Sequence, residues 1–369
     1  MYDPYKALYL HIPFCKQRCA YCDFATRAAD RDDPAIADYV DELVLEIRRA
    51  SREGKLGSIE TVYIGGGTPS HIGMGNLSKL LYTLSTSLHL TPEVECTMEA
   101  NPESLTEPMV KDLWALGVNR LSIGVQSFDD DLLRKLGRVH DAETAKRAIA
   151  CAQTRFENVS IDLMCGIPGQ SHESFAADLA CAIEAGVAHV SVYPLTVEEN
   201  TLLETLVESG ALEAPVEDVQ AIMMETALRV LDPAGYARYE VASYAKPGFE
   251  CRHNIAYWTG KPYLGFGTSA VTMTQNEARR MRVQDGQVID DLDRRQMCAE
   301  DLMLGMRMVQ GVSDEQVGAA ALLLPESLTV FRGLVEAGLA ERREGRYLPT
   351  VMGWLCGNEL YGRIFDMAP

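Results

Sequence analysis

The chain lacks long hydrophobic runs and is poor in basic residues. No apolar run approaches the roughly 18 residues needed to cross a bilayer, and the sequence starts with neither a signal peptide nor an arginine-rich transit segment. We therefore expect a cytoplasmic protein. Its 34 Lys and Arg residues are outnumbered by 53 Asp and Glu residues, which gives a net charge of −19. This charge disfavours a nucleic-acid partner, because non-specific binding to phosphates needs a basic surface.

Cysteine is also scarce. Ten cysteines in 369 residues are far fewer than a disulfide-stapled scaffold contains. Seven of them are scattered singly, and in a reducing compartment we expect these to be small core residues. Cys165 is singled out among them because it stands at the end of a predicted strand.

The other three cysteines, Cys15, Cys19 and Cys22, are grouped with the spacing Cys-x3-Cys-x2-Cys behind a short predicted strand. Three thiolates can hold three irons of a [4Fe-4S] cluster, which leaves the fourth iron open to a small ligand. The spacing differs from the paired Cys-x2-Cys of zinc sites, and no nearby histidine completes a tetrahedral set. A disulfide with a spare thiol fits poorly with the absence of a secretory signal. The cysteines therefore indicate an iron–sulfur cluster.

Strands and helices alternate from residue 7 to about residue 196. This alternation predicts repeated βαβ units with right-handed crossovers and a parallel sheet, so the expected fold class is α/β with an open, partial (β/α)6 barrel. The predicted strands are Ala7–Ile12, Thr61–Ile64, Glu95–Glu99, Arg120–Val125, Ser160–Met164 and His189–Leu195. The predicted helices are Ala35–Glu53, Met74–Leu88, Glu107–Leu116, Ala142–Gln153 and Glu173–Ala185.

Polar signals gather at the ends of these predicted strands. Five of them stand at or just after a carboxyl end, namely Cys15–Cys22, Gly65–Pro69, Glu99, Gln126 and Asp162. Ligands bind at this edge in parallel α/β architectures, so five signals in register predict one shared pocket. Taken alone, the glycine-rich Gly65–Pro69 is also compatible with a tight turn, and it lacks the ending of a phosphate-binding P-loop.

The pattern changes beyond about residue 197. We expect an α+β domain there and divide the chain into residues 1–215 and 216–369. Its predicted parts are helices at Asp218–Leu231 and Arg294–Met308, a hairpin around Asp285–Gly286 and a winged-helix-like segment from Leu328 to Pro349. Winged helices bind DNA or are purely structural, and the acidity of this chain favours the structural role.

The cysteine motif, with Tyr21 before its last cysteine, resembles the radical S-adenosylmethionine superfamily. The string Tyr9-Leu-His-Ile-Pro-Phe-Cys15 is more specific, because it resembles the family of the oxygen-independent coproporphyrinogen III oxidase and its relatives. The likeness extends through most of the chain, in the strings Met98-Glu-Ala-Asn-Pro102, Gly124-Val-Gln-Ser-Phe128, Arg138-Val-His140 and Ile161-Asp-Leu-Met-Cys-Gly-Ile-Pro-Gly169. The resemblance implies a radical-SAM core domain in residues 1–215, followed by that family's C-terminal domain in residues 216–369.

The resemblance also implies the cofactor ligands. Cys15, Cys19 and Cys22 would hold the cluster, with S-adenosylmethionine on the open iron. The family's positions for that cofactor fall on Tyr9, Tyr21, Gly66, Gly67, Thr68, Glu99, Gln126, Arg138 and Asp162. The chemistry is suitable, because carboxylates can bind ribose hydroxyls and Arg138 can pair with the methionyl carboxylate. Taken singly, Glu99 or Asp162 is equally compatible with a structural role.

Two departures from the oxidase point to another branch of its family. Phe24 stands where the oxidase has a further cysteine, and only eight residues precede Tyr9, where the oxidase carries a long extension. Both features resemble the haem chaperone branch. The string His253-Asn254-x-x-Tyr257-Trp258 reproduces a motif of that branch, and its residue types suit haem, since an imidazole can ligate iron and aromatic rings can pack on a porphyrin. Without that resemblance, the string would be typical of packing residues.

The resemblance therefore implies a haem chaperone. Haem would lie near His253 and Trp258, between the two domains or on the C-terminal one, and would pass to an acceptor haemoprotein, most simply a respiratory one. The alternative is an oxidase that decarboxylates propionate side chains of coproporphyrinogen III to vinyl groups by radical chemistry, since the cofactor residues are complete. A third alternative is a cluster-based sensor that uses the winged-helix-like tail. A homodimer and a peripheral contact with a membrane are compatible with the sequence.

Overall fold

A twelve-stranded mixed sheet organises the molecule. The computed structural model describes every residue except 1, 89, 90 and 92. Six neighbouring strands of the sheet are parallel and follow one another in sequence order. They are β1 (Ala7–Ile12), β4 (Thr61–Gly66), β5 (Glu95–Ala100), β6 (Arg120–Gln126), β7 (Asn158–Cys165) and β8 (His189–Pro194). The predicted partial (β/α)6 barrel is therefore confirmed.

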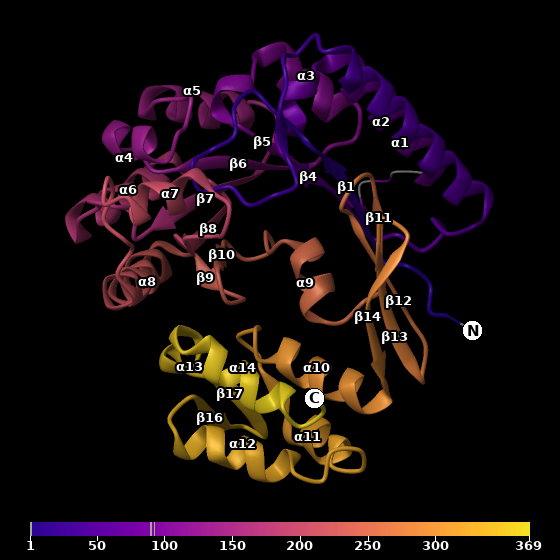
Figure 1. Cartoon of the computed structure of the whole chain (residues 1–369), viewed down its shortest axis with the longest axis vertical. Helices are drawn as coiled ribbons and strands as arrows, with labels where there is room; N and C mark the ends of the chain where they lie inside the picture. The colour runs from indigo at the N-terminus through magenta and orange to yellow at the C-terminus, as the bar shows by residue number, and fades with distance from the viewer. Residues whose placement is uncertain (1, 89–90, 92) are drawn as a thin grey trace.

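Helices cover the outer face of these strands (Figure 1). Each of the five predicted helices is present within a few residues of its predicted ends, as α1 (Pro34–Arg52), α2 (Met74–Leu88), α3 (Glu107–Ala115), α5 (Ala142–Gln153) and α6 (His172–Ala185). Their ends follow the usual capping rules. The Asp33 side chain caps α1, with Pro34 in its first turn, and Gly186 ends α6 with φ of 68°. The short helices α4 (Asp130–Lys135) and α7 (Leu202–Glu208) and the single turns Pro69–Ile72 and Pro102–Ser104 complete this part.

Later strands extend the barrel at both of its edges. At one edge β10 (Ser243–Ala245) pairs antiparallel with β8, and β9 (Ala237–Arg238) pairs with β10. At the other edge β11 (Tyr263–Phe266) pairs parallel with β1. A short helix, α9 (Arg252–Trp258), lies between β10 and β11 in the chain, so it crosses the open side of the barrel (Figure 1).

A long antiparallel ribbon continues the sheet beyond β11. Its strands are β12 (Val271–Gln275), β13 (Arg279–Gln284) and β14 (Gln287–Asp293). The predicted hairpin at Asp285–Gly286 joins the last two strands, and both turn residues have positive φ. On the far side of the barrel, α8 (Glu217–Leu231) matches the helix predicted there and packs on α6. The single turn Asp232–Ala234 follows it.

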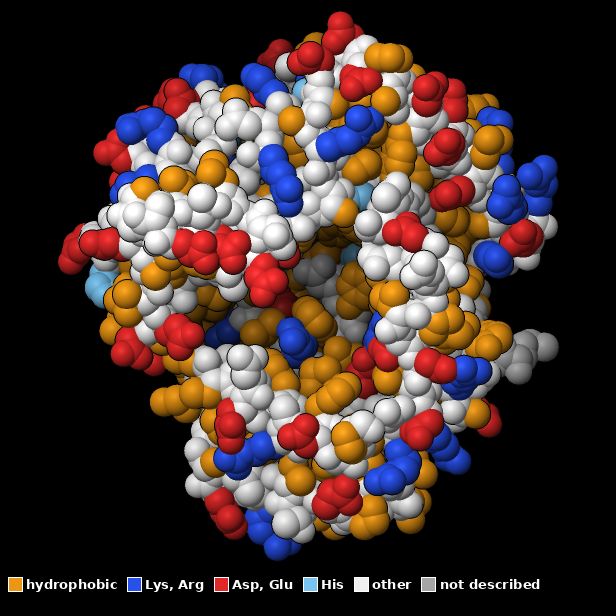
Figure 2. Space-filling model, viewed as in Figure 1, with side chains coloured by type: hydrophobic (Ala, Val, Ile, Leu, Met, Phe, Trp, Pro, Cys, Tyr) orange, Lys and Arg blue, Asp and Glu red, His pale blue; other side chains and the backbone are white. Residues whose placement is uncertain are grey.

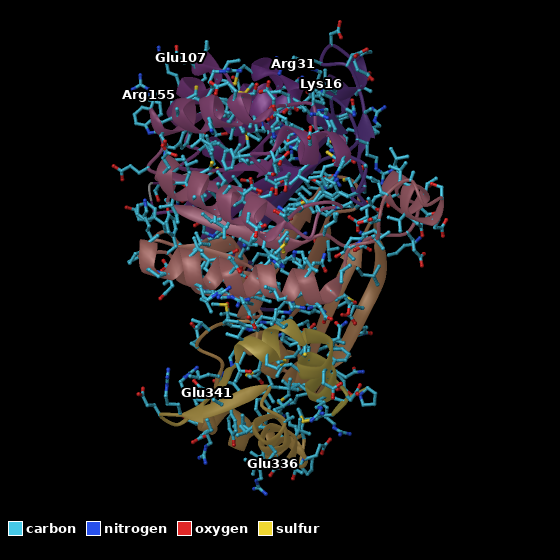
Figure 3. The ribbon with its side chains drawn as sticks, turned by 90° about the vertical axis from the view of Figure 1, so that its left-hand side faces the viewer. Lys16, Arg31, Glu107, Arg155, Glu336 and Glu341 are labelled. Atoms are coloured by element: carbon cyan, nitrogen blue, oxygen red, sulfur yellow. The ribbon has the colours of Figure 1, made fainter. Side chains whose placement is uncertain are left out.

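The last part of the chain has the element order of a winged helix. The order is α10 (Arg294–Gly305), β15 (Val312–Ser313), α11 (Asp314–Ala320), α12 (Ser327–Glu336), β16 (Ala340–Arg343) and β17 (Arg346–Pro349), followed by α13 (Val351–Leu355) and α14 (Gly357–Phe365). The three strands form their own sheet. Figure 3 shows this part at one end of the molecule, with Glu336 and Glu341 there and Lys16 and Arg31 at the other end. No helix among the described residues is long and apolar enough to cross a membrane.

Hydrophobic packing divides the chain later than the predicted domain boundary. One large core runs from Leu8 to Phe266 and includes side chains of α8. A second core runs from Ala299 to Ala368. Because α8 belongs to the first core, the packing break lies between Phe266 and Ala299, across the ribbon, and not at residue 215. The boundary between residues 215 and 216 stays a prediction.

Buried ion pairs join the ribbon to the C-terminal part. Arg280 of β13 is 2% exposed and pairs with Glu300 and with Asp301, both on α10. Arg282 pairs with Glu300 as well, at 2.7 Å. Since Arg280 and Glu300 are shielded from water, losing either one would leave a buried charge unpaired, so this pair holds α10 against the ribbon.

The scattered cysteines do not all behave as predicted. Cys96, Cys165 and Cys251 are fully buried core residues, as expected. Cys356 is exposed at the junction of α13 and α14, so the prediction was wrong for this residue. A thiol at a turn between two short helices has no neighbouring layer to cover it.

Candidate functional site

The cysteine loop is closed by two very short strands. β2 (Phe14–Cys15) pairs parallel with β3 (Arg27–Ala28), which brings the two ends of the loop together. The loop is also tied down in its middle, because the Ala20 N–H donates to the Leu136 carbonyl at 2.9 Å and the Ala20 carbonyl accepts from the Leu203 N–H at 2.7 Å. These bonds hold the three cysteines at the carboxyl edge of the barrel.

All three thiols line one cavity. Cys15 is 8% exposed, while Cys19 and Cys22 are half-buried. Burial raises the pKa of Cys15, and the nearby thiols of Cys22 and Cys19 raise it further. No three His, Cys, Asp or Glu side chains in the described ranges converge on one metal ion. A [4Fe-4S] cluster does not require the three thiols to converge on one ion, because each cysteine binds a different iron. The thiols therefore fit a cluster better than a single ion.

The same cavity contains the residues that the family resemblance assigned to S-adenosylmethionine, except Tyr9. It is lined by Cys15, Gln17, Arg18, Cys19, Tyr21, Cys22, Phe24, Gly66, Gly67, Thr68, Glu99, Ala100, Asn101, Ser122, Gly124, Gln126, Arg138 and Asp162. Residues from six different segments meet here because the carboxyl ends of parallel strands share one edge. The structure thus brings the predicted residues together, and their individual roles stay predictions.

The glycine-rich edge comes close to the cysteine loop. Gly66 has φ of 113°, a backbone conformation that favours glycine. A Cβ on Gly67 would lie 2.9 Å from the Cys15 sulfur. Any larger residue at Gly67 would therefore push against the Cys15 sulfur.

Two half-buried carboxyl groups face the cavity. Glu99 accepts hydrogen bonds from the Tyr63 hydroxyl at 2.8 Å and the Gly66 N–H at 3.0 Å. Burial raises the pKa of Glu99 to about 7, and the neighbouring Asp162 adds to the rise. Burial also raises the pKa of Asp162, which lies 3.4 Å from the Ser122 hydroxyl. A ligand that brings hydroxyl donors and a positive charge would relieve this cost of burying two carboxylates.

Arg138 links the cysteines to the strand ends. Its guanidinium donates to the Cys19 sulfur at 3.3 Å, to the Asn101 side chain at 2.9 Å and to the Gly124 carbonyl at 2.6 Å. Burial lowers the pKa of Arg138, but its interactions with the Tyr21 and Cys19 side chains raise it above its ordinary value. The Nε–H is buried and has no partner among the described residues. This free donor suits a carboxylate such as that of the methionyl group.

The sequence did not single out three supporting residues. Asn101 orients both Arg138 and Thr68, to which it donates at 3.1 Å. Tyr63 holds Glu99. Asp178 of α6 fixes the loop after Gln126, because it accepts from the Ser127 hydroxyl at 2.9 Å and the Phe128 N–H at 2.6 Å. A buried aspartate inside an amphipathic helix was the only available signal for Asp178.

Tyr9 and the His-Asn-x-x-Tyr-Trp string lie around a second cavity of about 270 Å³. It is lined by Tyr9, Tyr63, His253, Asn254, Tyr257, Tyr263, Ser269 and Val271. Tyr63 adjoins both cavities, since its hydroxyl holds Glu99 in the first one. Trp258 does not line the second cavity.

His253 is the buried centre of this aromatic cavity. Its ring lies 5.1 Å from the Tyr63 ring and 4.9 Å from the Tyr257 ring, between centroids. Its Nδ1 shares a 2.9 Å hydrogen bond with the Thr61 hydroxyl, while Nε2 has no partner in the described part of the chain. Burial lowers the pKa of His253 to about 3, and the charge of Arg120 lowers it too. The imidazole is therefore neutral, the form that ligates metals.

The string folds as helix α9 with help from a distant strand. α9 has no capping side chain of its own. Glu95, the first residue of β5, accepts from the N–H groups of Arg252 and His253 at 3.0 Å each. This carboxylate satisfies the first turn of the helix and fixes it across the barrel opening.

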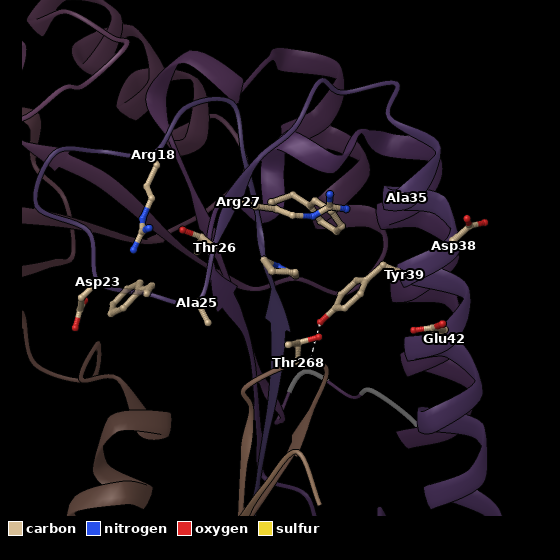
Figure 4. Close-up of a pocket in the computed structure, with 13 residues that line it drawn as sticks. Arg18, Asp23, Ala25, Thr26, Arg27, Ala35, Asp38, Tyr39, Glu42 and Thr268 are labelled. Atoms are coloured by element: carbon tan, nitrogen blue, oxygen red, sulfur yellow. Dashed lines mark hydrogen bonds between the residues drawn. The ribbon is translucent and has the colours of Figure 1, made fainter. Parts of the chain in front are cut away.

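A wider groove of about 600 Å³ lies on the outer side of the cysteine loop (Figure 4). Arg18 and Asp23 of the loop lie on one side of it, and Asp38 and Glu42 of α1 lie on the other. Phe24, the residue in place of the oxidase's further cysteine, is 57% exposed and lines both this groove and the cofactor cavity. A cysteine at position 24 would add a fourth thiol to the cavity, whereas Phe24 adds an aromatic ring.

The barrel, the cysteine loop and the glycine-rich edge together define a radical-SAM protein. A family model described as the Radical SAM superfamily matches residues 9–182. The fold is similar to a solved structure of coproporphyrinogen III oxidase (HemN) from Escherichia coli, with a TM-score of 0.80 and 21% identity, covering 99% of this chain and 90% of that chain. At this identity the likeness concerns the fold.

Curated relatives narrow the family further. The chain is 33% identical to the haem chaperone HemW of Bacillus subtilis, over 97% of this chain and 98% of the relative. It is 40% identical to the Escherichia coli HemW, over 72% and 70% respectively. The Mycobacterium tuberculosis HemW is 36% identical, over 85% and 84%. The chain therefore belongs to the HemW family of radical-SAM proteins, in agreement with the resemblance read from its motifs.

Proposed function

We propose that this protein is a haem chaperone, which binds haem and transfers it to an acceptor haemoprotein. The observation that carries the proposal is the buried Nε2 of His253, which has no partner in the described part of the chain and lies among tyrosine rings beside the cofactor cavity. A neutral imidazole nitrogen without a partner is a suitable axial ligand for haem iron. The name of the curated relatives supports the same role.

The second cavity would hold only part of a porphyrin. Its volume of about 270 Å³ lies below the roughly 300–1,000 Å³ of usual ligand pockets. Figure 2 shows a hollow in the middle of one face, between the barrel and the C-terminal part, with hydrophobic and basic side chains inside it. We infer that the rest of the haem lies in this hollow, beside α9, which agrees with the predicted place between the two parts of the chain.

The cofactor cavity completes the proposal. Cys15, Cys19 and Cys22 would hold a [4Fe-4S] cluster, and Glu99, Asp162 and Arg138 would bind S-adenosylmethionine through its hydroxyls and its carboxylate. The cluster would supply the open iron to which this cofactor attaches. Cytoplasmic location, a respiratory acceptor, a homodimer and a peripheral membrane contact stay predictions from the sequence.

Separate loss of the two sites tests this function. In His253→Ala the haem absorption maximum should shift and haem affinity should fall roughly tenfold or more, while iron content and S-adenosylmethionine binding stay unchanged. Replacing Cys15, Cys19 and Cys22 together by alanine should abolish the cluster absorption. His172→Ala is the matched control, because this exposed histidine at the start of α6 lines neither cavity.

The alternative function is the oxidase, and the complete cofactor cavity is the observation in its favour. The chaperone should transfer bound haem to an apo-haemoprotein and should not convert coproporphyrinogen III when reductant is supplied. Turnover at ordinary enzyme rates, about 1–10³ per second, would contradict the chaperone. Unchanged haem binding after loss of both His253 and Trp258 would contradict it as well.

A further inference from the structure

Arg307 lies between two aromatic rings and forms no ion pair with any acidic residue that the structure describes. It follows α10, and its guanidinium carbon lies 4.9 Å from the Trp258 ring centre and 4.7 Å from the Tyr361 ring centre. These rings come from α9 on the barrel side and α14 on the C-terminal side. Since Arg307 forms no ion pair within the described part of the chain, its stacked guanidinium can still take a negatively charged ligand.

The polar atoms around Arg307 are donors that lack acceptors. The Nε–H of Arg307, the indole N–H of Trp258 and the hydroxyl of Tyr361 are all buried and have no hydrogen-bond partner among the described residues. Leaving three such donors unsatisfied in a buried position is costly. A carboxylate offers about four acceptor positions on two oxygens, so one carboxylate could satisfy all three donors.

Glu240 is a carboxyl group of the protein that lies beside this cluster. It is 2% exposed and lies beside Trp258 without a hydrogen bond of normal geometry to the indole nitrogen. Its Oε2 accepts from the Ala242 N–H at 3.3 Å, and burial raises its pKa. The second arginine here, Arg238, stacks on Trp354 at 3.8 Å and is occupied with the carbonyl of Glu240 at 3.2 Å. The free donors therefore belong to Arg307, Trp258 and Tyr361.

We propose that Arg307, Trp258 and Tyr361 form a carboxylate-binding site that holds a propionate side chain of haem. The inference rests on the proposed haem binding and deepens it, since it names the group that would orient the porphyrin. Trp258 lies four residues after Asn254 on α9, so the two share one face of the helix, one turn apart. Asn254 lines the second cavity. A flat ligand whose ring enters that cavity beside His253 can therefore place a carboxylate against Arg307.

Haem and its dimethyl ester, in which both propionates are blocked, separate carboxylate binding from ring binding. The wild-type protein should bind haem roughly ten- to a hundredfold more tightly than the ester, as expected for hydrogen bonds to a charged group. Arg307→Gln should bind both ligands with the same affinity, close to that of the ester on the wild type. Tyr361→Phe, which removes one hydroxyl and keeps the ring, should lower the preference several-fold.

Arg363→Gln is the matched control, because it removes the same charge from α14 at an exposed position paired with Glu359. It should keep the full preference for haem. A preference that survives in Arg307→Gln and Tyr361→Phe, or equal binding of haem and ester by the wild type, would overturn the carboxylate site alone. Failure of the wild type to bind either porphyrin would instead contradict the proposed function.

Discussion

At the residue scale, Glu99 connects the two cavities, because it accepts a hydrogen bond from the hydroxyl of Tyr63. Its carboxylate accepts from Tyr63, whose ring packs against His253 in the aromatic cavity. Its own cavity holds the cysteines and Arg138. The protonation state of Glu99 would therefore decide whether this side chain accepts or donates hydrogen bonds at the proposed S-adenosylmethionine site.

The raised pKa of Glu99 predicts a pH-dependent cofactor affinity. With a pKa of about 7, the group is mostly ionised at pH 8 and mostly protonated at pH 6. Only the carboxylate accepts from ribose hydroxyls and attracts a sulfonium, so affinity for S-adenosylmethionine should fall about tenfold from pH 8 to pH 6. Calorimetric titration of anaerobically reconstituted protein measures this affinity at each pH. Glu99→Gln should bind more weakly and show a flat profile; an equally steep profile in this variant would assign the titration to another group.

The sequence predicted the site residues better than their supports. Cysteines, a glycine-rich string and carboxylates at strand ends carry their chemistry in their type and position, so they can be recognised before the fold is known. Asn101, Tyr63 and Asp178 act only through residues far along the chain: Asp178 bonds to a loop fifty residues before it. Such partnerships are set by tertiary packing, which local patterns do not encode.

At the element scale, α9 is a short helix that depends on another strand. It has seven residues and no capping side chain, and isolated helices of that length are unstable in water. Glu95 of β5 supplies the missing cap across the barrel. This dependence explains why the sequence revealed the string His253-Asn254-x-x-Tyr257-Trp258 but not the helix that carries it.

Removing the Glu95 carboxylate should therefore loosen α9. Hydrogen bonds to a charged acceptor contribute about 1.5–3 kcal/mol each, so Glu95→Ala should lower the free energy of unfolding in urea by at least about 2 kcal/mol. Amide hydrogen exchange should rise at Arg252 and His253. Glu93→Ala is the control, since that side chain is exposed two residues away. Slow exchange at α9 in Glu95→Ala would show that the helix is held by its aromatic contacts instead.

The strands of the barrel were easier to predict than the ribbon beyond it. Each barrel strand is a short apolar run between two helical patterns, which is typical of a parallel sheet covered on its outer face. In the ribbon, β14 is largely exposed and carries several aspartates. The sequence predicted the hairpin around Asp285–Gly286 but not the bounds of its strands, which the pairing of β14 with β13 defines.

At the scale of the whole molecule, two hydrophobic cores are joined by buried charges. The first core ends at Phe266 and the second begins at Ala299. Between them Arg280 of the ribbon pairs with Glu300 and Asp301 of α10. A small cluster that includes Cys251 and Met308 adds apolar contact.

Loss of Arg280 should uncouple the two cores. Removing one partner of a buried ion pair leaves uncompensated charge and costs about 3–5 kcal/mol, so Arg280→Leu should unfold in two transitions, with the C-terminal part melting first. Scanning calorimetry of both forms measures the separation. The neighbouring Arg279 pairs with Asp291 at the exposed surface. Arg279→Leu is therefore the control, and it should keep the wild-type melting profile. A single unshifted transition in Arg280→Leu would mean that apolar contacts alone join the two parts.

The pairing of β1 with β11 means that the sheet can be completed only late in the synthesis of this chain. Ala7 leaves the ribosome early, yet its partner Tyr263 follows only after most of the protein has been made. Until then β1 presents an unpaired edge, and such edges invite pairing with other chains. The outer edge of β8 likewise stays unpaired until β10 has been made. A nascent chain stopped at residue 215 would therefore carry two unpaired barrel edges, and the segment from Ser243 to Phe266 later covers both of them.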